Sequence, residues 1–156
     1  MKILMVCLGN ICRSPLAEGI LKEKFKQNGI KGTVDSAGTA AYHAGEKPDP
    51  RSIEVARKYG IDIKSQTARK FRIEDFDNFD KIFVMDGENF DNIKLVARNN
   101  NDIQKVDLIL NQAFPDKNLH VPDPYYGGKD GFENVYNMLD NACDVIVEKI
   151  KNNNLL

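Results

Sequence analysis

A cysteine and an arginine at the two ends of a short loop, Cys7 and Arg13, are the side chains in this sequence best suited to chemistry. The apolar residues 3–6 before the loop are too few for a helix and predict a buried strand. Ser14 and Pro15 after it are typical of a helix start. Because unpaired N–H groups and a partial positive charge gather at the start of a helix, such a loop can hold a tetrahedral oxyanion. The cysteine predicts that the anion is attacked as well as held.

The spacing within the loop suits one phosphate group. The number of residues between Cys7 and Arg13 is about enough to turn successive amides inward around a single phosphate. These residues are Leu8, Gly9, Asn10, Ile11 and Cys12. Glycine adopts positive φ freely and asparagine tolerates it, so the loop can close tightly. The field of the helix start favours the thiolate form of Cys7, which is the reactive form. Ser14 can donate its hydroxyl to the same sulfur.

Arg13 can offset the electrostatic repulsion that opposes this chemistry. A thiolate that approaches a phosphate dianion is repelled by roughly 4 kcal/mol per charge pair at 4 Å in a partly buried site. The guanidinium can bind two phosphate oxygens at once and, with the loop amides, offsets that repulsion. The alternative is that Cys7 is a small buried hydrophobe ending a core strand, as free cysteines often are. Gly9, Asn10 and the Ser-Pro helix start favour the anion-binding loop, because a core strand does not need them.

The composition excludes several other classes of protein. The chain has 156 residues, enough for one domain, and a net charge of −1 with 29% charged residues leaves no basic surface of the kind that nucleic acid needs. No apolar run is long enough to span a membrane, and the apolar start is too short for a signal peptide. Three cysteines are an odd number and form no disulfide framework, so we expect a cytoplasmic protein.

The rest of the chain predicts strands and helices in alternation. Further strands are expected at residues 33–37, 81–85 and 106–110, and helices at 14–28, 49–59, 89–98 and 132–150. Ser14 is expected to cap the first helix, with Glu18 in its first turn. Strands separated by helices form parallel sheets, which bind ligands outside the carboxyl ends of the strands. We therefore expect an α/β fold with a single domain over residues 1–156: a three-layer sandwich with a four-stranded parallel sheet, helices on both faces and a phosphate-binding loop after the first strand.

A second candidate site follows the fourth predicted strand, in the segment DPYYGG at residues 123–128. Pro122 and Pro124 stiffen the loop, and Gly127 and Gly128 restore its conformational freedom. The carboxylic acid Asp123 can protonate the leaving oxygen of a phosphate ester, and the tyrosines beside it can flank an aromatic substrate. Taken alone, the segment is better explained as an ordinary Asp-Pro turn on the surface.

Other polar residues predict little chemistry. His43 and His120 have no partner at metal-ligand spacing and are expected to be solvated loop residues, which argues against a zinc site. Two asparagine-rich stretches, residues 99–101 and 152–154, are expected to be a loop and a frayed tail.

Three separated motifs give the chain a family resemblance. CLGNICRS at residues 7–14, DSAG at 35–38 and DPYY at 123–126 together resemble the low-molecular-weight protein tyrosine phosphatases, of the acid phosphatase type. The resemblance runs nearly end to end. It implies hydrolysis of phosphotyrosine in proteins and of small aryl phosphates.

The resemblance also implies roles for individual residues. Cys7 would be the nucleophile that forms a phosphocysteine, Arg13 the phosphate clamp, and Asp123 the general acid and then the general base. Asn10 would hold the loop in its strained form through a bond to Ser36. The substrate-binding residues would be Leu8, Gly9, Asn10, Ile11, Cys12, Ser14, Tyr42 and Tyr125.

Further implied roles concern redox chemistry, the mouth of the site and the support of the loop. Cys12 resembles a second loop cysteine of the family, which can form a protective disulfide with the nucleophile. Tyr42 and Tyr125 would form opposite walls, and Tyr125 and Tyr126 correspond to phosphorylation sites of eukaryotic members. A His that braces the loop asparagine in those members is replaced here by Gln66, which can donate and accept but cannot titrate.

Relatives with the same loop carry out other reactions. Thiol-linked arsenate reductases relay a disulfide to further cysteines, but residues 81–98 contain none, and Cys143 lies on the apolar face of the last predicted helix. Protein arginine phosphatases resemble this loop with Thr in place of Ile11. A phosphotyrosine-binding module without turnover is a third alternative, although nucleophile, clamp and acid are all present.

The phosphatase interpretation carries expectations about cofactors and partners. It requires no cofactor and no metal, because Arg13 and the loop amides supply the positive charge. The expected partners are phosphotyrosine-containing proteins, with phosphate or other oxyanions as product or inhibitor, and no nucleic acid. The oligomeric state is left open.

Overall fold

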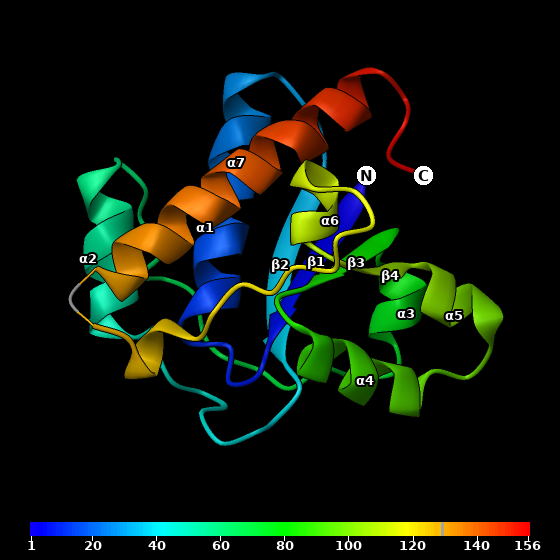
Figure 1. The fold of residues 1–156 in the computed structure, drawn as a ribbon, viewed down its shortest axis with the longest axis horizontal. Coiled ribbons are helices and arrows are strands. Elements are labelled where there is room, and N and C mark those ends of the chain that lie inside the picture. Colours follow the sequence, from blue (N-terminus) through cyan, green and yellow to red (C-terminus); the bar gives the residue numbers. More distant parts are fainter. Residues whose placement is uncertain (129) are drawn as a thin grey trace.

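A four-stranded parallel sheet forms the centre of the computed structural model (Figure 1), which describes residues 1–128 and 130–156. The strands β1 (Lys2–Cys7), β2 (Thr33–Gly38), β3 (Lys81–Val84) and β4 (Val106–Leu108) lie in the order β2-β1-β3-β4. Every pairing between neighbours is parallel. The predicted sheet is therefore confirmed, with the first strand in a central position.

Helices follow the strands as predicted. The long ones are α1 (Arg13–Gln27), α2 (Pro50–Lys58), α4 (Gly87–Val96) and α7 (Gly131–Lys151). The short ones, which the sequence pattern did not predict, are α3 (Asp75–Asn78), α5 (Asn100–Gln104), α6 (Leu110–Ala113) and the 3₁₀ turn η1 (Pro124–Tyr126).

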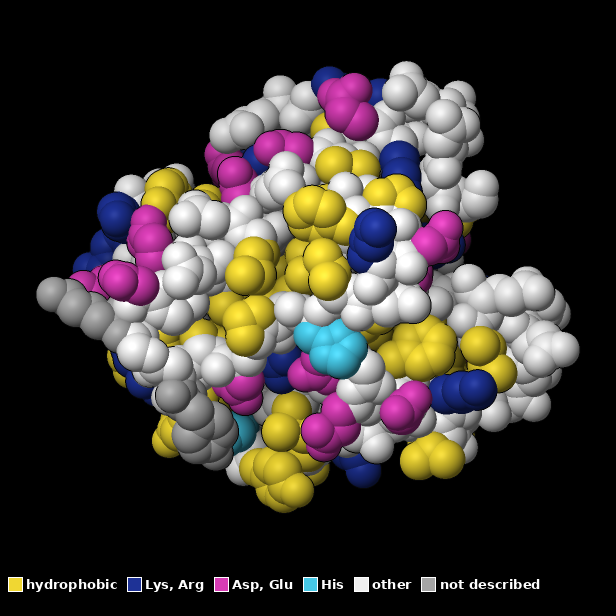
Figure 2. All heavy atoms as spheres, in the orientation of Figure 1, with side chains coloured by type: hydrophobic (Ala, Val, Ile, Leu, Met, Phe, Trp, Pro, Cys, Tyr) yellow, Lys and Arg dark blue, Asp and Glu magenta, His cyan; other side chains and the backbone are white. Residues whose placement is uncertain are grey.

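Charges of both signs are interspersed on the surface. On the face drawn in Figure 2, Lys and Arg side chains lie among Asp and Glu side chains, in keeping with the net charge of −1. Within residues 1–128 and 130–156, no helix combines the length and the apolar character needed to cross a membrane.

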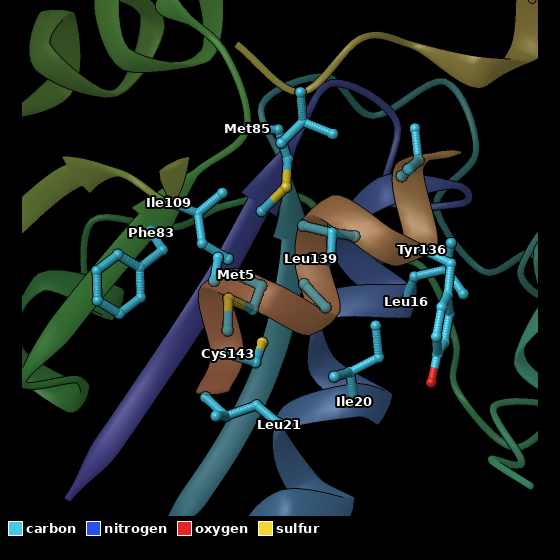
Figure 3. Close-up of a cluster of buried hydrophobic side chains, with 14 of the residues drawn as sticks. Met5, Leu16, Ile20, Leu21, Phe83, Met85, Ile109, Tyr136, Leu139 and Cys143 are labelled. Carbon is cyan, nitrogen blue, oxygen red and sulfur yellow. The ribbon is translucent and has the colours of Figure 1, made fainter. Parts of the chain in front are cut away.

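Alternation along β1 divides the core between the two faces of the sheet. Because successive side chains of a strand point to opposite faces, Ile3 and Met5 join a cluster with α1 and α7, whereas Leu4 and Val6 join one with α3 and α4. Figure 3 shows side chains of α1 and α7, among them Leu139, packed beside Met5. Helices cover both faces, which confirms the three-layer arrangement.

The first helix begins two residues earlier than a cap at Ser14 would place it. It begins at Arg13 with Cys12 in the N-cap position, so the predictions that Ser14 caps the helix and that Glu18 lies in its first turn were wrong. The Ser14 hydroxyl bonds side chains of the preceding loop instead. Glu18 is buried in the second turn, where it accepts a hydrogen bond from Ser36 of β2. Buried partners have overridden local capping preferences here.

The asparagine-rich stretches are also more structured than predicted. The side chain of Asn99 accepts a hydrogen bond from the backbone N–H of Asp102 and caps α5, so residues 99–101 are not a plain loop. Beyond α7, Leu155 packs into the core with 7% of its surface exposed. Leu155, together with backbone hydrogen bonds from residues 152–154 to the end of α7, thus anchors the tail that was expected to fray.

Candidate active site

The loop between Cys7 and Arg13 joins the carboxyl end of β1 to the start of α1. The segment after β2 runs beside it: Thr39 and Ala40 donate backbone hydrogen bonds to the carbonyls of Cys7 and Leu8, at 2.9 and 3.0 Å. A Cβ atom on Gly38 would lie 2.7 Å from the Leu8 carbonyl oxygen. Glycine at the end of β2 therefore permits the close approach that supports the loop.

Asn10 holds the loop in a strained conformation. Its φ angle is 57°, in the left-handed region, and its side chain is buried. The side-chain nitrogen donates to the hydroxyls of Ser14 and Ser36, at 2.8 and 2.9 Å. The side-chain oxygen accepts from the backbone N–H of Arg69 at 3.0 Å. Three side-chain hydrogen bonds, two of them with distant segments, thus offset the cost of the positive φ.

Gln66 does not provide the expected brace for Asn10. Its side-chain nitrogen donates to the backbone carbonyl of Pro15 in α1, at 3.1 Å. Both hydrogens of the Asn10 amide are already taken by Ser14 and Ser36. Gln66 therefore supports the start of α1, and the loop asparagine depends on hydroxyl and backbone partners.

The sulfur of Cys7 receives hydrogen bonds from two directions. The backbone N–H of Asn10 donates to it at 3.3 Å, and the Ser14 hydroxyl lies 3.0 Å away. Because the Ser14 oxygen already accepts a hydrogen bond from Asn10, its own proton is available for the sulfur. This arrangement stabilises a negative charge on Cys7.

Arg13 is buried and bound by two residues from outside the loop. Its Nη1 lies 2.6 Å from the Asp86 carboxylate and donates to the Val121 carbonyl at 3.0 Å. Burial acts to lower its pKa, but the charges of Cys7 and Asp86 raise the pKa of Arg13 above its ordinary value. The guanidinium therefore stays charged. Sequence reasoning missed Asp86, although its place directly after the third strand put it at the ligand-binding edge.

A cavity of about 210 Å³ opens over the loop and brings most of the predicted site residues together. It is lined by Cys7, Leu8, Gly9, Ile11, Cys12, Arg13, Tyr42, His43, Asp123 and Tyr125. Nucleophile and clamp candidates from one loop and the acid candidate from a distant segment thus face one space. Asn10, Ser14 and Ser36 lie behind it as the buried support of the loop.

The acid candidate Asp123 lies at the N-cap of η1. Its carboxylate accepts a hydrogen bond from the backbone N–H of Tyr125 at 3.0 Å, which fixes the orientation of the carboxyl group relative to the turn. Tyr125 is half-exposed and Tyr42 is 79% exposed, so both stand at the mouth of the cavity. The side chain of Tyr126, where a phosphorylation site was considered, lies outside the described part of the structure.

Sequence reasoning also missed His43 as a residue of the cavity. It lies in a turn, as predicted, but its ring packs against the loop: a Cβ atom on Gly9 would lie 3.0 Å from its Cδ2. Its Nδ1 lies 2.7 Å from Glu46. His120 is exposed, next to Gly87. No sequence signal identified His43, because its role depends on how the turn folds over Gly9.

Cys12 lies in the same cavity but in a different electrostatic environment. Burial, together with the negative charges of Asp49 and Cys7, raises the pKa of Cys12 to about 12. Cys12 is therefore a neutral thiol at physiological pH. Within the described residues, no group of three or more His, Cys, Asp or Glu side chains is arranged to hold a metal ion.

Comparisons with known proteins agree with the motifs. The family model described as "Low molecular weight phosphotyrosine protein phosphatase" matches residues 2–155. A protein of that description from Schizosaccharomyces pombe is 46% identical over 138 residues, covering 86% of this chain and 87% of its own.

Solved structures extend the agreement to the fold. The crystal structure of a protein tyrosine phosphatase from Entamoeba histolytica has a TM-score of 0.92 at 38% identity, covering 99% of both chains. An arginine phosphatase from Drosophila has a TM-score of 0.89 at 30% identity, covering 97% of this chain and 98% of its own. The match over nearly the whole length confirms the resemblance drawn from the three motifs: the chain belongs to the low molecular weight phosphotyrosine protein phosphatase family.

Proposed function

We propose that this protein hydrolyses phosphotyrosine in proteins, and small aryl phosphates, through a phosphocysteine intermediate. Residues 1–156 act as one catalytic domain, with Cys7 as nucleophile, Arg13 as phosphate clamp and Asp123 as general acid and base. The observation that carries the proposal is the single cavity lined by all three side chains at the start of a helix. Membership of the family supports the same reaction.

In the first step, the Cys7 thiolate attacks phosphorus in line with the phenolic leaving group. The bond between phosphorus and the phenolic oxygen breaks as the bond to sulfur forms, and Asp123 gives its proton to the departing oxygen. Arg13 and the inward amides of the loop stabilise the charge on the equatorial oxygens. This stabilisation needs neither metal nor cofactor.

In the second step, water hydrolyses the phosphocysteine. The ionised Asp123 takes a proton from the water, the bond between sulfur and phosphorus breaks, and the electron pair returns to Cys7. The Ser14 hydroxyl, 3.0 Å from the sulfur, stabilises the expelled thiolate. Inorganic phosphate is then both the product and a competing ligand of the loop, as other oxyanions would be.

The walls of the cavity favour a flat aromatic ester. Tyr42 and Tyr125 stand at the mouth and Ile11 lines the cavity, so a phenyl ring entering the mouth meets aromatic and apolar side chains. The alternative substrate is phosphoarginine, because the Drosophila arginine phosphatase has a similar fold. A thiol-linked reductase is disfavoured because Cys143 is fully buried against α1.

The cellular setting is proposed on the same chemistry. A thiolate nucleophile requires a reducing compartment, which favours the cytoplasm. Oxidation of Cys7 by a peroxide would give a sulfenic acid, and attack by the Cys12 thiol would release water and form a disulfide between the two residues. We propose this pair as reversible protection of the nucleophile, and phosphotyrosine-containing proteins as the partners.

Phosphate release from a phosphotyrosine peptide in the presence of a chelator tests the reaction. The native protein is expected to turn over with a bell-shaped pH dependence and a mildly acidic optimum, because a thiolate and a protonated acid are needed together. Cys7→Ser is expected to abolish turnover. Peptide binding without turnover by the native protein would indicate a binding module, and neither binding nor turnover would direct attention to phosphoarginine and arsenate.

Leaving-group dependence tests the role of Asp123. Asp123→Asn is expected to reduce kcat/KM far more for phenyl phosphate than for p-nitrophenyl phosphate, because nitrophenolate leaves without protonation. Equal losses on the two esters would remove Asp123 from the acid role.

A further inference from the structure

We infer that Arg51 is a positioning residue for the general acid, holding the turn that carries Asp123 at a fixed distance from the nucleophile loop. The inference rests on the proposed function, because it assumes that Asp123 protonates the leaving group. Sequence reasoning gave Arg51 no role. It lies in the first turn of α2, a helix that contains no proposed catalytic residue.

The first turn of α2 is tied directly to the nucleophile loop. The backbone N–H of Asp49 donates to the Ile11 carbonyl at 2.8 Å. The Ser52 hydroxyl donates to the Cys12 carbonyl at 3.2 Å, and Ser52 is fully buried. The start of α2 and the loop around Cys7 therefore form one hydrogen-bonded unit.

Arg51 is bound to Asp49 within this unit. The Asp49 carboxylate accepts from the Arg51 backbone N–H at 2.8 Å, and from Nε and Nη2 of the guanidinium at 3.0 Å each. A two-pronged contact of this kind fixes both the position and the plane of the guanidinium. The positive charge of Arg51 is compensated by the Asp49 carboxylate with which it is paired.

From this fixed position the guanidinium reaches the acid turn. Its central carbon lies 5.0 Å from the ring centre of Tyr125 and 4.7 Å from that of Phe132. Phe132 belongs to the first turn of α7, which lies beside α2 and η1 (Figure 1). The cation therefore contacts the ring in the acid turn and the ring in the helix that follows it.

The contact with Tyr125 bears on Asp123 through one hydrogen bond. The backbone N–H of Tyr125 donates to the Asp123 carboxylate at 3.0 Å. Holding the Tyr125 side chain holds this backbone, and with it the carboxyl group that the N–H orients. The chain of contacts from Ile11 through Asp49, Arg51 and Tyr125 to Asp123 thus sets the distance between nucleophile loop and acid.

Leaving-group dependence separates a positioning role from a binding role. We would measure kcat/KM for phenyl phosphate and p-nitrophenyl phosphate with Arg51→Ala and Arg51→Lys, because kcat/KM includes every step up to departure of the phenol. Since a general acid contributes typically 10²–10⁴-fold, a misplaced one is expected to cost on the order of tenfold on phenyl phosphate. The loss on p-nitrophenyl phosphate is expected to be less than threefold.

Matched variants complete the test. Arg57→Ala removes an exposed cation of the same helix and is expected to leave both rates within twofold of the native values. The constant for inhibition by inorganic phosphate is expected to stay within twofold in the Arg51 variants, because the Cys7 loop is intact. Arg51→Lys keeps the charge but not the flat guanidinium, so it is expected to show most of the loss even if Arg51→Ala does not fold.

A double variant shows whether the effect passes through Asp123. In an Asp123→Asn background, Arg51→Lys is expected to change kcat/KM less than twofold, since no acid remains to be positioned. A full additional loss in that background, or equal losses on the two esters, would overturn the inference. Failure of the acid role itself would appear separately, as equal losses caused by Asp123→Asn alone.

Discussion

The side-chain nitrogen of Asn10 donates to the Ser14 hydroxyl at 2.8 Å, and this bond sets the direction of the next one, from Ser14 to the Cys7 sulfur. An oxygen that is already accepting from an amide has its proton free to donate. Asn10, whose positive φ strains the loop backbone, therefore also orients the Ser14 hydroxyl that stabilises the Cys7 thiolate.

Removing the Ser14 hydroxyl should slow hydrolysis of the phosphocysteine intermediate. A hydrogen bond to a charged group is worth about 1.5–3 kcal/mol, so Ser14→Ala is expected to lower kcat by roughly 10- to 100-fold. A burst of nitrophenol followed by slow turnover would show the phosphocysteine accumulating. The exposed Ser65→Ala is the control, and an unchanged kcat for Ser14→Ala would contradict the assignment.

Asp86→Asn should make stability depend on phosphate. The variant keeps an N-cap for α4 but leaves the buried Arg13 without its anionic partner, at a cost of about 1–3 kcal/mol. A bound phosphate replaces the missing negative charge, so added phosphate is expected to raise the Tm of this variant more than that of the native protein. Asp91→Asn, on the exposed side of the same helix, should behave like the native protein. Equal phosphate shifts in Asp86→Asn and the native protein would argue against this pairing.

Cys12 should resist alkylation by an external reagent, unlike Cys7. With its pKa raised to about 12 by burial first, then by nearby negative charge, only about one Cys12 side chain in 10⁵ is a thiolate at pH 7. Iodoacetamide is expected to label Cys7 in the native protein and to leave Cys12 unlabelled in Cys7→Ser, as judged by mass spectrometry. Labelling in guanidinium chloride serves as the control. Rapid labelling of Cys12 in folded Cys7→Ser would refute the prediction.

Glu18 should make stability fall as the pH rises. Burial outweighs its hydrogen bonds from Lys22 and Ser36 and raises the pKa of Glu18 above its ordinary 4.5. Such an acid binds its proton more tightly in the folded state, so its favourable contribution is complete below pH 4.5 and is lost as the pH rises through the folded value. In urea unfolding between pH 4 and 7, the native protein should lose stability relative to Glu18→Gln.

An exposed carboxylate provides the comparison for that experiment. Glu54→Gln on α2 should show no such trend against the native protein. A stability difference between the native protein and Glu18→Gln that stayed constant, or that grew with pH, would mean that burial does not dominate the environment of Glu18.

Periodic patterns predicted the parts of the fold that follow from local sequence. The alternation of apolar strands with helices was sufficient for the order of the long elements, and the loop composition was sufficient for an anion site after β1. The short helices escaped prediction because two turns or fewer carry no periodicity. Ser14 was assigned to the N-cap and Glu18 to the first helical turn because local preference cannot anticipate a buried partner such as Cys7 or Ser36.

The residues that were missed act across long sequence separations. Asp86 lies 73 residues from Arg13, and nothing near Arg13 in the sequence indicates its partner. Arg51 contacts Tyr125 only because α2 and η1 meet in space. Gln66 was placed against Asn10 by analogy with a His, but its amide bonds Pro15. Each case depends on which segments the fold brings together.

The central position of β1 has a consequence for behaviour under stress. Backbone amides of a strand paired on both sides exchange with solvent only when the whole protein opens, whereas a single 3₁₀ turn such as η1 opens at much lower cost. We expect mild heating to release the turn of Asp123 while the loop of Cys7 persists. A partly unfolded molecule would then still bind phosphotyrosine without releasing phenol, so it would sequester its substrates instead of hydrolysing them.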